Sequence, residues 1–348
     1  MRVALHADFS RFTGYGSDGI DLSMALAEEG IDVVPFPRTL TPGLPEKFTR
    51  LLQKDPTRRR PDVGLVFLSP RSMMRSHARL GERVVGYTMW DRTPIRPEDF
   101  ETPGDYDLTW LDRLAVTCPM NVQTFQGSYP DRQIDVVPGG IDAKEWAGPD
   151  RVPFDRPIRF LMAGSLTERK NPFALFEVWR ELKATVPDFD AELVVHSTAG
   201  NLEPGIAEAY GPGVTITTDR VSVQGLKALY ASCDVLVSPS RGEGNNRSAM
   251  EFMASGGPVI ASDWSGNQNF MHRDVGWLVA GELVECFDAR GAYWFEVDRD
   301  ALAAALLAAH WDRDMVARKG RLARQHIVSF GWDVTARRMV ETLAAARG

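Results

Sequence analysis

Cysteine and histidine are scarce in this sequence, and their spacing suggests neither a disulfide framework nor a metal site. The 348 residues include six histidines and three cysteines, Cys118, Cys233 and Cys286. An odd number of widely separated cysteines without a C-x-x-C pair does not build a set of disulfides, and no H-x-x-x-H or H-x-x-E-H spacing occurs. We therefore expect reduced, mostly buried thiols and no structural zinc.

Positive charge and long apolar runs are also lacking. The net charge is −7 and the pI about 5.5, so the overall balance attracts neither nucleic acid nor an anionic membrane. The dense basic run 57–61 is interpreted as a solvated loop. No apolar run approaches the ~20 residues of a membrane span, and residues 1–10 predict a strand rather than a signal peptide. We expect a cytoplasmic protein without a nucleic-acid partner or a transmembrane segment.

What the sequence does contain is a repeated alternation of short apolar, β-branched runs with amphipathic helical patterns. One core rarely grows past ~250–300 residues, so this length predicts two domains. Apolar strands separated by helices predict parallel sheets that are covered on both faces. The predicted strands are 2–7, 31–36, 62–68, 83–89, 107–111, 134–138, 158–164, 191–197, 213–218, 233–239 and 257–262.

The segment 136–157 is rich in proline and glycine, which break helices and strands, so the domain boundary is placed there. We expect a Rossmann-like first domain over 1–145, a Rossmann-like second domain over 155–328, and a C-terminal helix over 329–348 that docks back on the first domain. The fold class is α/β, with two doubly wound parallel sheets facing across a cleft. Such sheets bind ligands at the carboxyl ends of their strands, so each can hold one substrate.

The run 241–252, "RGEGNNRSAMEF", holds two acids, Glu243 and Glu251, with seven residues between them. It reads as a strand end, a glycine loop and a helix that begins near Arg247, with Asn245 or Asn246 as its cap. A helix N-terminus after a strand suits a phosphate. The acids would repel a diphosphate, so we expect them to accept hydrogen bonds from sugar hydroxyls. A solvated loop acid and a dipole-favoured helix acid remain an equally good account of the pair alone.

A second motif favours ligand binding over that alternative. In 158–179 a strand is followed by a loop and by a helix with Pro172 at or near its first position, and Arg169 and Lys170 stand just before it. Two cations at a helix N-terminus are unfavourable to its dipole, and they make sense if an anion lies there too. We therefore predict phosphate binding, with a solvated basic turn as the alternative.

With these motifs the chain resembles a retaining glycosyltransferase of the GT-B fold, specifically family four of the glycosyltransferases, also called glycosyl transferases group 1. The resemblance rests on the segment 229–267, with its Pro-Ser, Glu-Gly and second Glu after seven residues, followed by "ASGGPVIASD". It is supported by "AGSLTERKN" at 163–171, "VVPGGID" at 136–142 and "SFGWDVTARRMVETL" at 329–343. The specific motifs lie in 136–270.

The resemblance implies roles for residues of the second domain. Glu251 would bind ribose hydroxyls, Glu243 the donor sugar, and Lys170 the phosphate. The family's arginine after Gly164 is Ser165 here, which makes Arg169 the candidate substitute. The remaining expected ligand contacts are the sugar and diphosphate loop Gly244, Asn245 and Asn246, and the base contacts Arg220 and Val221.

In the first domain the resemblance implies that Gly14 and Gly16 let the backbone approach the transferred sugar. The alternative is a plain turn before a helix. Where the family often has a histidine on the acceptor side, this chain has Trp90 and Asp91. Asp91 is either the catalytic acceptor of a proton or a cap of the next segment, and Trp90 is interpreted as a packing or sugar-stacking residue.

The implied function is transfer of a sugar from a UDP- or GDP-sugar to an acceptor hydroxyl, with retention of configuration. Because Asp-x-Asp is missing from a suitable place, we expect no obligatory metal, and no cofactor beyond the donor substrate. The acceptor, a small molecule, a glycan or a protein, cannot be read from the sequence. The alternatives are an inactive nucleotide-sugar-binding protein, or an epimerase or hydrolase of the same fold.

Overall fold

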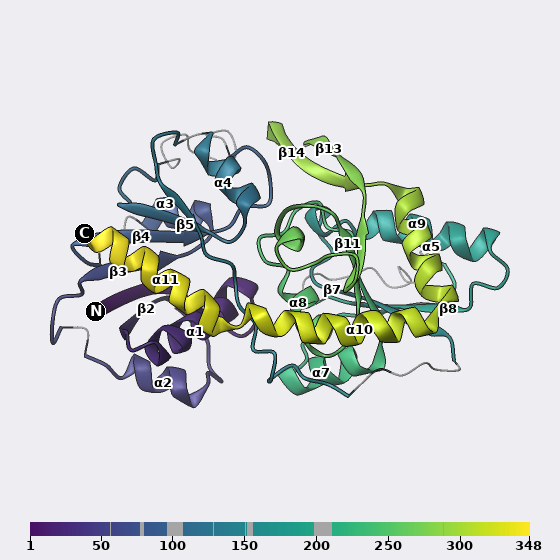
Figure 1. Ribbon diagram of the computed structural model, residues 1–348, viewed down its shortest axis with the longest axis horizontal. Coiled ribbons are helices and arrows are strands. Elements are labelled where there is room, and N and C mark those ends of the chain that lie inside the picture. The colour runs from purple at the N-terminus through teal and green to yellow at the C-terminus, as the bar shows by residue number, and fades with distance from the viewer. Residues whose placement is uncertain are drawn as a thin grey trace. The chain divides into compact units, whose positions relative to one another are not determined.

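The computed structural model describes residues 1–55, 57–76, 80–95, 107–127, 129–149, 151, 156–197, 211–287 and 289–348. Within these residues the chain forms two compact units (Figure 1). The first comprises Met1–Gly140, Glu285–Tyr293 and Phe330–Gly348, and the second comprises Ile141–Val284 and Trp294–Ser329. The chain first passes between the units at Gly140–Ile141, inside the proline- and glycine-rich segment.

The first unit is built on a six-stranded parallel sheet in the order β2-β1-β3-β4-β5-β6. The strands are β1 (Arg2–Phe9), β2 (Asp32–Leu40), β3 (Val63–Phe67), β4 (Arg83–Thr88), β5 (Arg113–Val116) and β6 (Ile134–Val136). Strand β3 is buried along its whole length, as expected for a central strand covered on both faces.

Helices cover this sheet, and the last helix of the chain is one of them (Figure 1). They are α1 (Gly14–Glu28), α2 (Glu46–Leu52), α3 (Pro70–Ser76), α4 (Pro119–Gln126) and α11 (Trp332–Arg347). Helix α1 starts at Thr13, whose hydroxyl accepts from Gly16 N at 3.1 Å, and it gives way to β2 at Gly30 with φ of 79°. Helix α11 packs beside α1, and its Met339 and Leu343 are fully buried in the core of this unit.

The second unit is built on a separate six-stranded parallel sheet in the order β12-β11-β10-β7-β8-β9. The strands are β7 (Ile158–Ala163), β8 (Ala191–His196), β9 (Val214–Thr217), β10 (Val235–Ser238), β11 (Val259–Ser262) and β12 (Gly276–Val279). The predicted α/β class with two parallel sheets is therefore confirmed.

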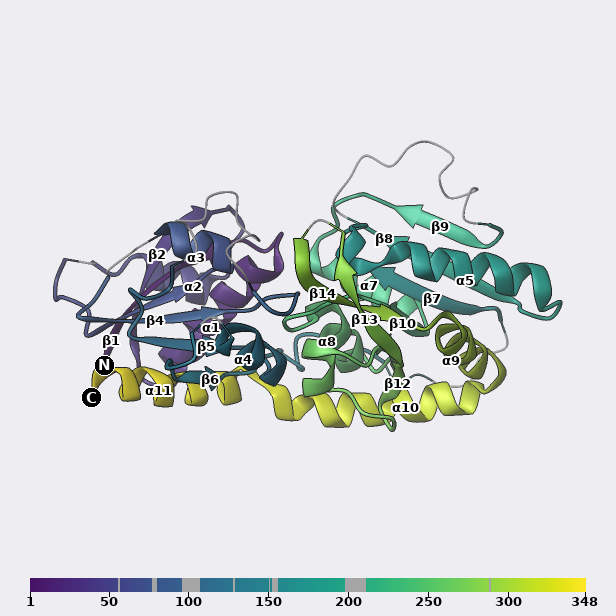
Figure 2. The same cartoon turned by 90° about the horizontal axis from the view of Figure 1, so that it is seen from above.

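The helices of the second unit cover its sheet, with α5 against α9 and α10 against α8 (Figure 2). They are η3 (Glu168–Lys170), α5 (Pro172–Thr185), α7 (Val223–Ser232), α8 (Arg247–Ala254), η4 (Ser265–Asn269), α9 (Arg299–Trp311) and α10 (Arg313–Ile327), which continues into η5 (Val328–Phe330). A two-stranded hairpin, β13 (Gly281–Cys286) and β14 (Ala289–Val297), forms a sheet of its own. Across the described residues, every helix falls short of the length and apolarity that crossing a bilayer requires.

Two details differ from the sequence-based expectation. The predicted strand 107–111 is a turn, because the carboxylate of Asp107 accepts from Thr109 N at 2.7 Å and Leu111 N donates to Leu108 O at 3.1 Å. The strand β5 begins two residues later, at Arg113. Strand β12 and the hairpin β13–β14 were not predicted.

Helix α11 gives a direct test of what holds the first unit together. Leu343 is fully buried in that core, whereas Glu341 on the same helix is exposed. We expect Leu343→Ala to lower the free energy of unfolding by about 2–5 kcal/mol, because it leaves a cavity in a packed core. Urea unfolding followed by circular dichroism measures this change. Glu341→Ala is the matched control, expected within about 0.5 kcal/mol of wild type, and equal effects of the two variants would contradict the packing described.

Candidate functional site

Three loops lie side by side at the carboxyl edge of the second sheet. They follow β7, β10 and β11, which are neighbours in the sheet, and parallel strands end at the same edge. Hydrogen bonds join the loops: Arg241 N donates to Arg169 O at 2.7 Å, and Gly266 N donates to Glu243 O at 2.9 Å. The loops 164–171, 239–246 and 263–269 therefore form one structure, which we call the three-loop site.

At the centre of the three-loop site a carboxylate is held between two cations. Glu243 accepts from Lys170 Nζ at 2.6 Å and from Arg169 Nη1 at 3.1 Å, and it is 4 % exposed. The sequence predicted that the anion beside these two cations is a ligand phosphate. In the structure the anion that both contact is a side chain of the protein itself. Together the three groups leave one net positive charge.

The ion pairs determine the charge state of Glu243. Burial by itself raises the pKa of this carboxyl, but the nearby charges of Lys170 and Arg169, with the hydrogen bond from Lys170, outweigh burial and lower the pKa from 4.5 to about 2. The group is therefore ionised at any pH near neutrality. An ionised carboxylate accepts hydrogen bonds and donates none, so Glu243 cannot act as a general acid there.

The short helix η3, which carries both cations, is attached to the Glu243 loop through its backbone. The carbonyl oxygen of Arg169 accepts from Arg241 N at 2.7 Å and from the hydroxyl of Ser240 at 3.0 Å. The guanidinium of Arg169 also donates to Gly242 O at 2.8 Å. These contacts fix the spacing between the two loops, because each loop satisfies main-chain groups of the other.

The third loop supports the backbone of Glu243. Ser265 adopts a left-handed conformation with φ of 52°, and its hydroxyl lies 2.9 Å from Glu243 N and 3.0 Å from Glu243 O. A Cβ added to Gly266 would lie 2.5 Å from Gly244 O, so only glycine fits there. The sequence reading did not assign a role to these residues. A signal was present, since "SGN" follows a buried strand as a turn sequence does.

The two asparagines after the glycine loop have different surroundings. Asn246 precedes α8 in a left-handed conformation with φ of 42°, but its side chain makes no capping bond. It donates instead to Asn267 Oδ1 at 2.7 Å and to the Ser238 hydroxyl at 3.1 Å, which ties the Glu243 loop to the third loop. The predicted cap is thus wrong in its bonding, although the helix begins where expected. Asn245 is buried beside Gly244, and its Nδ2 has no hydrogen-bond partner among the described residues.

Glu251 lies on α8, is buried, and is oriented by two partners. Its Oε2 accepts from the Tyr230 hydroxyl at 2.9 Å and its Oε1 from Arg247 Nε at 2.7 Å. Burial, reinforced by the charge of Glu251 and the bond to it, raises the pKa of Tyr230 well above its usual range, so the phenol stays a donor. Tyr230 and Arg247 were not predicted from the sequence.

The other expected ligand contacts of this unit fall in two places. Gly164 has φ of 140° and lies against the Lys170 side chain, where an added Cβ would be 3.5 Å from Lys170 Cε. Ser165 follows it, half-buried, in the three-loop site. Arg220 and Val221 lie on the exposed segment between the edge strand β9 and α7, away from the loops of the central strands.

The residues predicted in the first unit come together around Tyr15, in the first turn of α1. Gly14 has open space around it, whereas a Cβ added to Gly16 would lie 2.5 Å from Ser10 O. The Tyr15 hydroxyl donates to Met89 O at 3.1 Å. Burial, with the negative charge of Asp91 among the further contributions, raises the pKa of Tyr15 well above its usual value.

Trp90, next to Asp91, is clamped by an amide: Asn121 accepts from Trp90 N at 3.0 Å and donates to Trp90 O at 2.7 Å. This clamp fixes the main chain at the residue before Asp91. The loop that carries Asp91 is therefore ordered at the carboxyl end of β4, where a substrate of the first sheet would bind.

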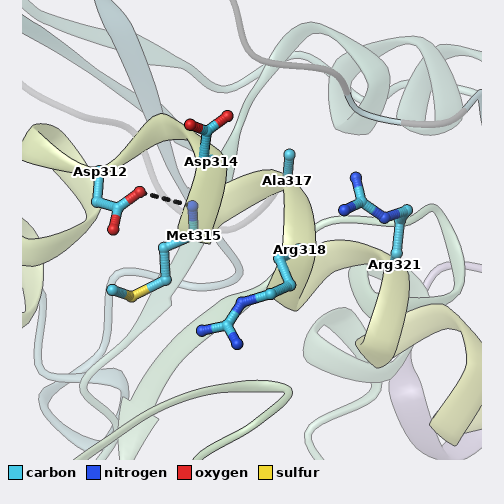
Figure 3. A pocket seen from close by; sticks show the side chains of 6 residues that line it. All are labelled: Asp312, Asp314, Met315, Ala317, Arg318 and Arg321. Carbon is cyan, nitrogen blue, oxygen red and sulfur yellow. Dashed lines mark hydrogen bonds between the residues drawn. The ribbon is translucent and has the colours of Figure 1, made fainter.

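One surface depression lies elsewhere, along α10, with a volume of about 490 Å³ (Figure 3). Asp312 caps this helix by accepting from Met315 N at 2.7 Å. The lining residues are Asp312, Asp314, Met315, Ala317, Arg318 and Arg321. None of the predicted site residues lines it. The described part of the chain also holds no cluster of three or more histidine, cysteine, aspartate or glutamate residues fit for a metal.

The sequence is similar to those of known glycosyltransferases. Residues 157–308 match the family described as Glycosyl transferases group 1. The chain is 30 % identical over 250 residues to a D-inositol 3-phosphate glycosyltransferase of Paenarthrobacter aurescens (strain TC1), covering 67 % of this chain and 57 % of that protein. A counterpart from Arthrobacter sp. (strain FB24) is 28 % identical over 228 residues, covering 61 % and 50 %. The chain thus spans about half the length of these curated relatives.

Solved structures resemble this chain over nearly its whole length. Sucrose-phosphate synthase from Thermosynechococcus elongatus superimposes with a TM-score of 0.69 at 18 % identity, covering 98 % of each chain. Anabaena Alr3699/HepE, solved in complex with UDP and glucose, superimposes with a TM-score of 0.67 at 14 % identity, covering 99 % of this chain and 100 % of that one. These likenesses establish the GT-B fold.

The pKa of Glu243 leads to a prediction about acid stability. Because the folded-state pKa lies below the ordinary value of 4.5, the pair stabilises the protein above about pH 4.5, and this stabilisation is lost as the pH falls toward 2. We expect Lys170→Met to lower the free energy of unfolding at pH 7 by on the order of 1–3 kcal/mol, with a difference that shrinks as the pH falls below 4.5.

Urea unfolding at several pH values between 7 and 3 measures this difference. The matched control is Lys47→Met, which removes an ion pair to Glu28 at 3.0 Å whose two side chains are largely exposed. Exposed pairs contribute little, so the control should stay near wild type at every pH. A Lys170→Met difference that is independent of pH would contradict the coupling of Lys170 to Glu243.

Proposed function

Since residues 157–308 belong to the glycosyl transferases group 1 family, we propose that the protein transfers a sugar from a nucleotide diphosphate sugar to an acceptor hydroxyl. The observation that carries the proposal is the cluster of Lys170, Arg169 and Glu243 at the carboxyl edge of the second sheet. It offers net positive charge beside a carboxylate that only accepts hydrogen bonds. In a nucleotide diphosphate sugar, the diphosphate needs the positive charge and the sugar hydroxyls need the hydrogen-bond acceptor.

The diphosphate would lie against Lys170, Arg169 and the backbone amides at the start of α8. When the bond between the sugar carbon C1 and the phosphate oxygen breaks, its electron pair goes to that oxygen. Fixed cations that already surround the developing charge lower the barrier, because they need not reorganise. Ser165, which offers one neutral hydroxyl, leaves Arg169 as the second cation of the diphosphate site.

The two glutamates have separate roles in this proposal. Glu243 accepts from hydroxyls of the transferred sugar, because its lowered pKa keeps it ionised and so excludes proton donation to the leaving group. Glu251 accepts from the ribose hydroxyls, and Tyr230 and Arg247 set the plane of its carboxylate beforehand. Uracil is the favoured base, since UDP is present in the complex of the similar protein HepE.

The remaining steps involve the acceptor. Its hydroxyl oxygen bonds to C1 as the phosphate oxygen leaves, on the same face, which retains the anomeric configuration. The proton of that hydroxyl passes to the departing diphosphate. In this proposal Lys170 and Arg169 supply the positive charge that the departing diphosphate needs, so the transfer requires no metal ion.

Lys170 can be tested by comparing ligands with and without phosphates. We expect Lys170→Ala to weaken binding of UDP by about 10- to 100-fold while leaving uridine binding within about twofold, because in this proposal the diphosphate is the only part of UDP that Lys170 contacts. Isothermal titration calorimetry with the two ligands measures this split. The matched control is Lys144→Ala, which removes an exposed lysine of the same unit. This variant should bind both ligands as the wild type does. An equal loss for UDP and uridine would contradict the assignment.

Glu251 leads to a second comparison. We expect Glu251→Gln to weaken UDP binding by about tenfold but 2′,3′-dideoxy-UDP binding hardly at all, because only the ribose hydroxyls donate to the carboxylate. Competition binding with both nucleotides measures the difference. Loss of affinity for the dideoxy compound to the same degree would remove Glu251 from the ribose site.

The reaction itself is tested by incubating the protein with UDP-glucose, UDP-N-acetylglucosamine and GDP-mannose, each with a panel of hydroxyl acceptors. We expect release of the nucleoside diphosphate and a glycosylated product by mass spectrometry, with undiminished turnover in EDTA. Strict dependence on a divalent cation would contradict the metal-free site, and turnover of the donor without any acceptor would identify a hydrolase or epimerase.

A further inference from the structure

Glu296, on strand β14 of the hairpin, joins two of the loops through one carboxylate. Its Oε1 accepts from Asn171 Nδ2 at 2.9 Å, and its Oε2 accepts from Arg241 Nε at 2.6 Å. Asn171 directly follows Lys170, and Arg241 comes two residues before Glu243. The hairpin therefore contacts both of the loops that carry the central ion pair. In one loop the contact is one residue from Lys170, and in the other it is two residues from Glu243.

Arg241 contacts the hairpin through more than its bond to Glu296. Besides Glu296, its guanidinium donates to Glu168 Oε2 at 2.8 Å and lies 5.9 Å from the ring centre of Trp294. Its carbonyl oxygen accepts from Phe295 N at 3.0 Å. Three consecutive residues of β14, Trp294, Phe295 and Glu296, thus contact Arg241. The hairpin therefore holds Arg241 in position.

The Asn171 contact restrains a conformation that would otherwise be unfavourable. Asn171 has φ of 53°, ends η3 and precedes α5, and is 1 % exposed. A left-handed residue that is not glycine persists where its surroundings hold it, and asparagine is among the residues that tolerate it best. The bond to Glu296 is such a restraint. It lies one peptide unit from the residue whose Nζ contacts Glu243.

We propose that Glu296 is a positioning residue, which holds Lys170, Arg169 and Glu243 at the spacing needed to bind the diphosphate of the donor. It acts through Asn171 and Arg241 and not by touching substrate. This inference rests on the proposed function, since it assumes that the three-loop site binds a diphosphate. It extends the site to the hairpin β13–β14, which is outside the sequence motifs of the three loops.

Charge and geometry predict opposite effects at this position, which makes the proposal testable. Removing a carboxylate near a diphosphate site should tighten binding of an anion, if charge alone matters. Removing a restraint on the cations should weaken it. Glu296→Asp keeps the charge but is one methylene shorter, Glu296→Gln loses the charge but keeps the reach and one acceptor oxygen, and Glu296→Ala loses both.

The experiment is calorimetric titration of wild type and the three variants with UDP, GDP and ADP in EDTA, and with the corresponding nucleosides. With the best diphosphate we expect about tenfold weaker binding for Glu296→Ala and Glu296→Asp, a smaller loss for Glu296→Gln, and unchanged nucleoside binding. Glu282→Ala, an exposed acid on the same hairpin, is the matched control and should bind as wild type does.

A double-mutant cycle separates positioning from general structural damage. If Glu296 positions Lys170, Glu296→Ala should weaken diphosphate binding less in the Lys170→Ala background than in the wild type, because one of the positioned cations is already absent. Additive losses, tighter binding by Glu296→Ala, or equal losses for diphosphate and nucleoside would overturn the inference and leave the proposed function standing. If the wild type itself binds none of the three diphosphates, the proposed function is overturned and the inference with it.

Discussion

The ion pair between Lys170 and Glu243 connects two loops at the carboxyl edge of the second unit's sheet. Lys170 comes from the loop after β7 and Glu243 from the loop after β10, which are adjacent strands. The carboxylate is buried, and it remains ionised because two cations outweigh the cost of burial. The spacing of the loops, the conformations of Asn171 and Ser265, and the packing at Gly266 all serve to hold these charges in place.

This arrangement reconciles two demands that conflict in a protein without a ligand. A site for a diphosphate needs concentrated positive charge, yet two neighbouring cations at the N-terminus of a helix are unfavourable when the site is empty. Glu243 acts as their counter-ion. In the proposed function the same side chain also accepts from sugar hydroxyls, because a carboxylate can accept more than two hydrogen bonds. Charge neutralisation and sugar recognition can therefore share one residue.

Much of this could be predicted from the sequence, and the exceptions have physical reasons. Strand–loop–helix units are local, so the sheets and the placement of Glu243, Glu251, Arg169 and Lys170 followed from apolar runs and glycines. Pairing between different loops is not local: Lys170 is 73 residues and Ser265 is 22 residues from Glu243, so neither contact was predicted. The segment 107–111 was misread because its apolar residues are buried in a turn closed by Asp107. Strand β13 of the hairpin was missed because its side chains are mostly exposed, and exposed strands lack the apolar run on which the prediction relied.

The central claim is that the cations of the three-loop site bind the diphosphate of a nucleotide sugar while Glu243 faces the sugar. A crystal structure of the protein with UDP-glucose tests it most directly. The account predicts oxygen atoms of the diphosphate within hydrogen-bonding distance of Lys170 Nζ, and a sugar hydroxyl within that distance of the Glu243 carboxylate. A nucleotide sugar bound elsewhere, with Lys170 contacting Glu243 and no phosphate oxygen, would contradict it.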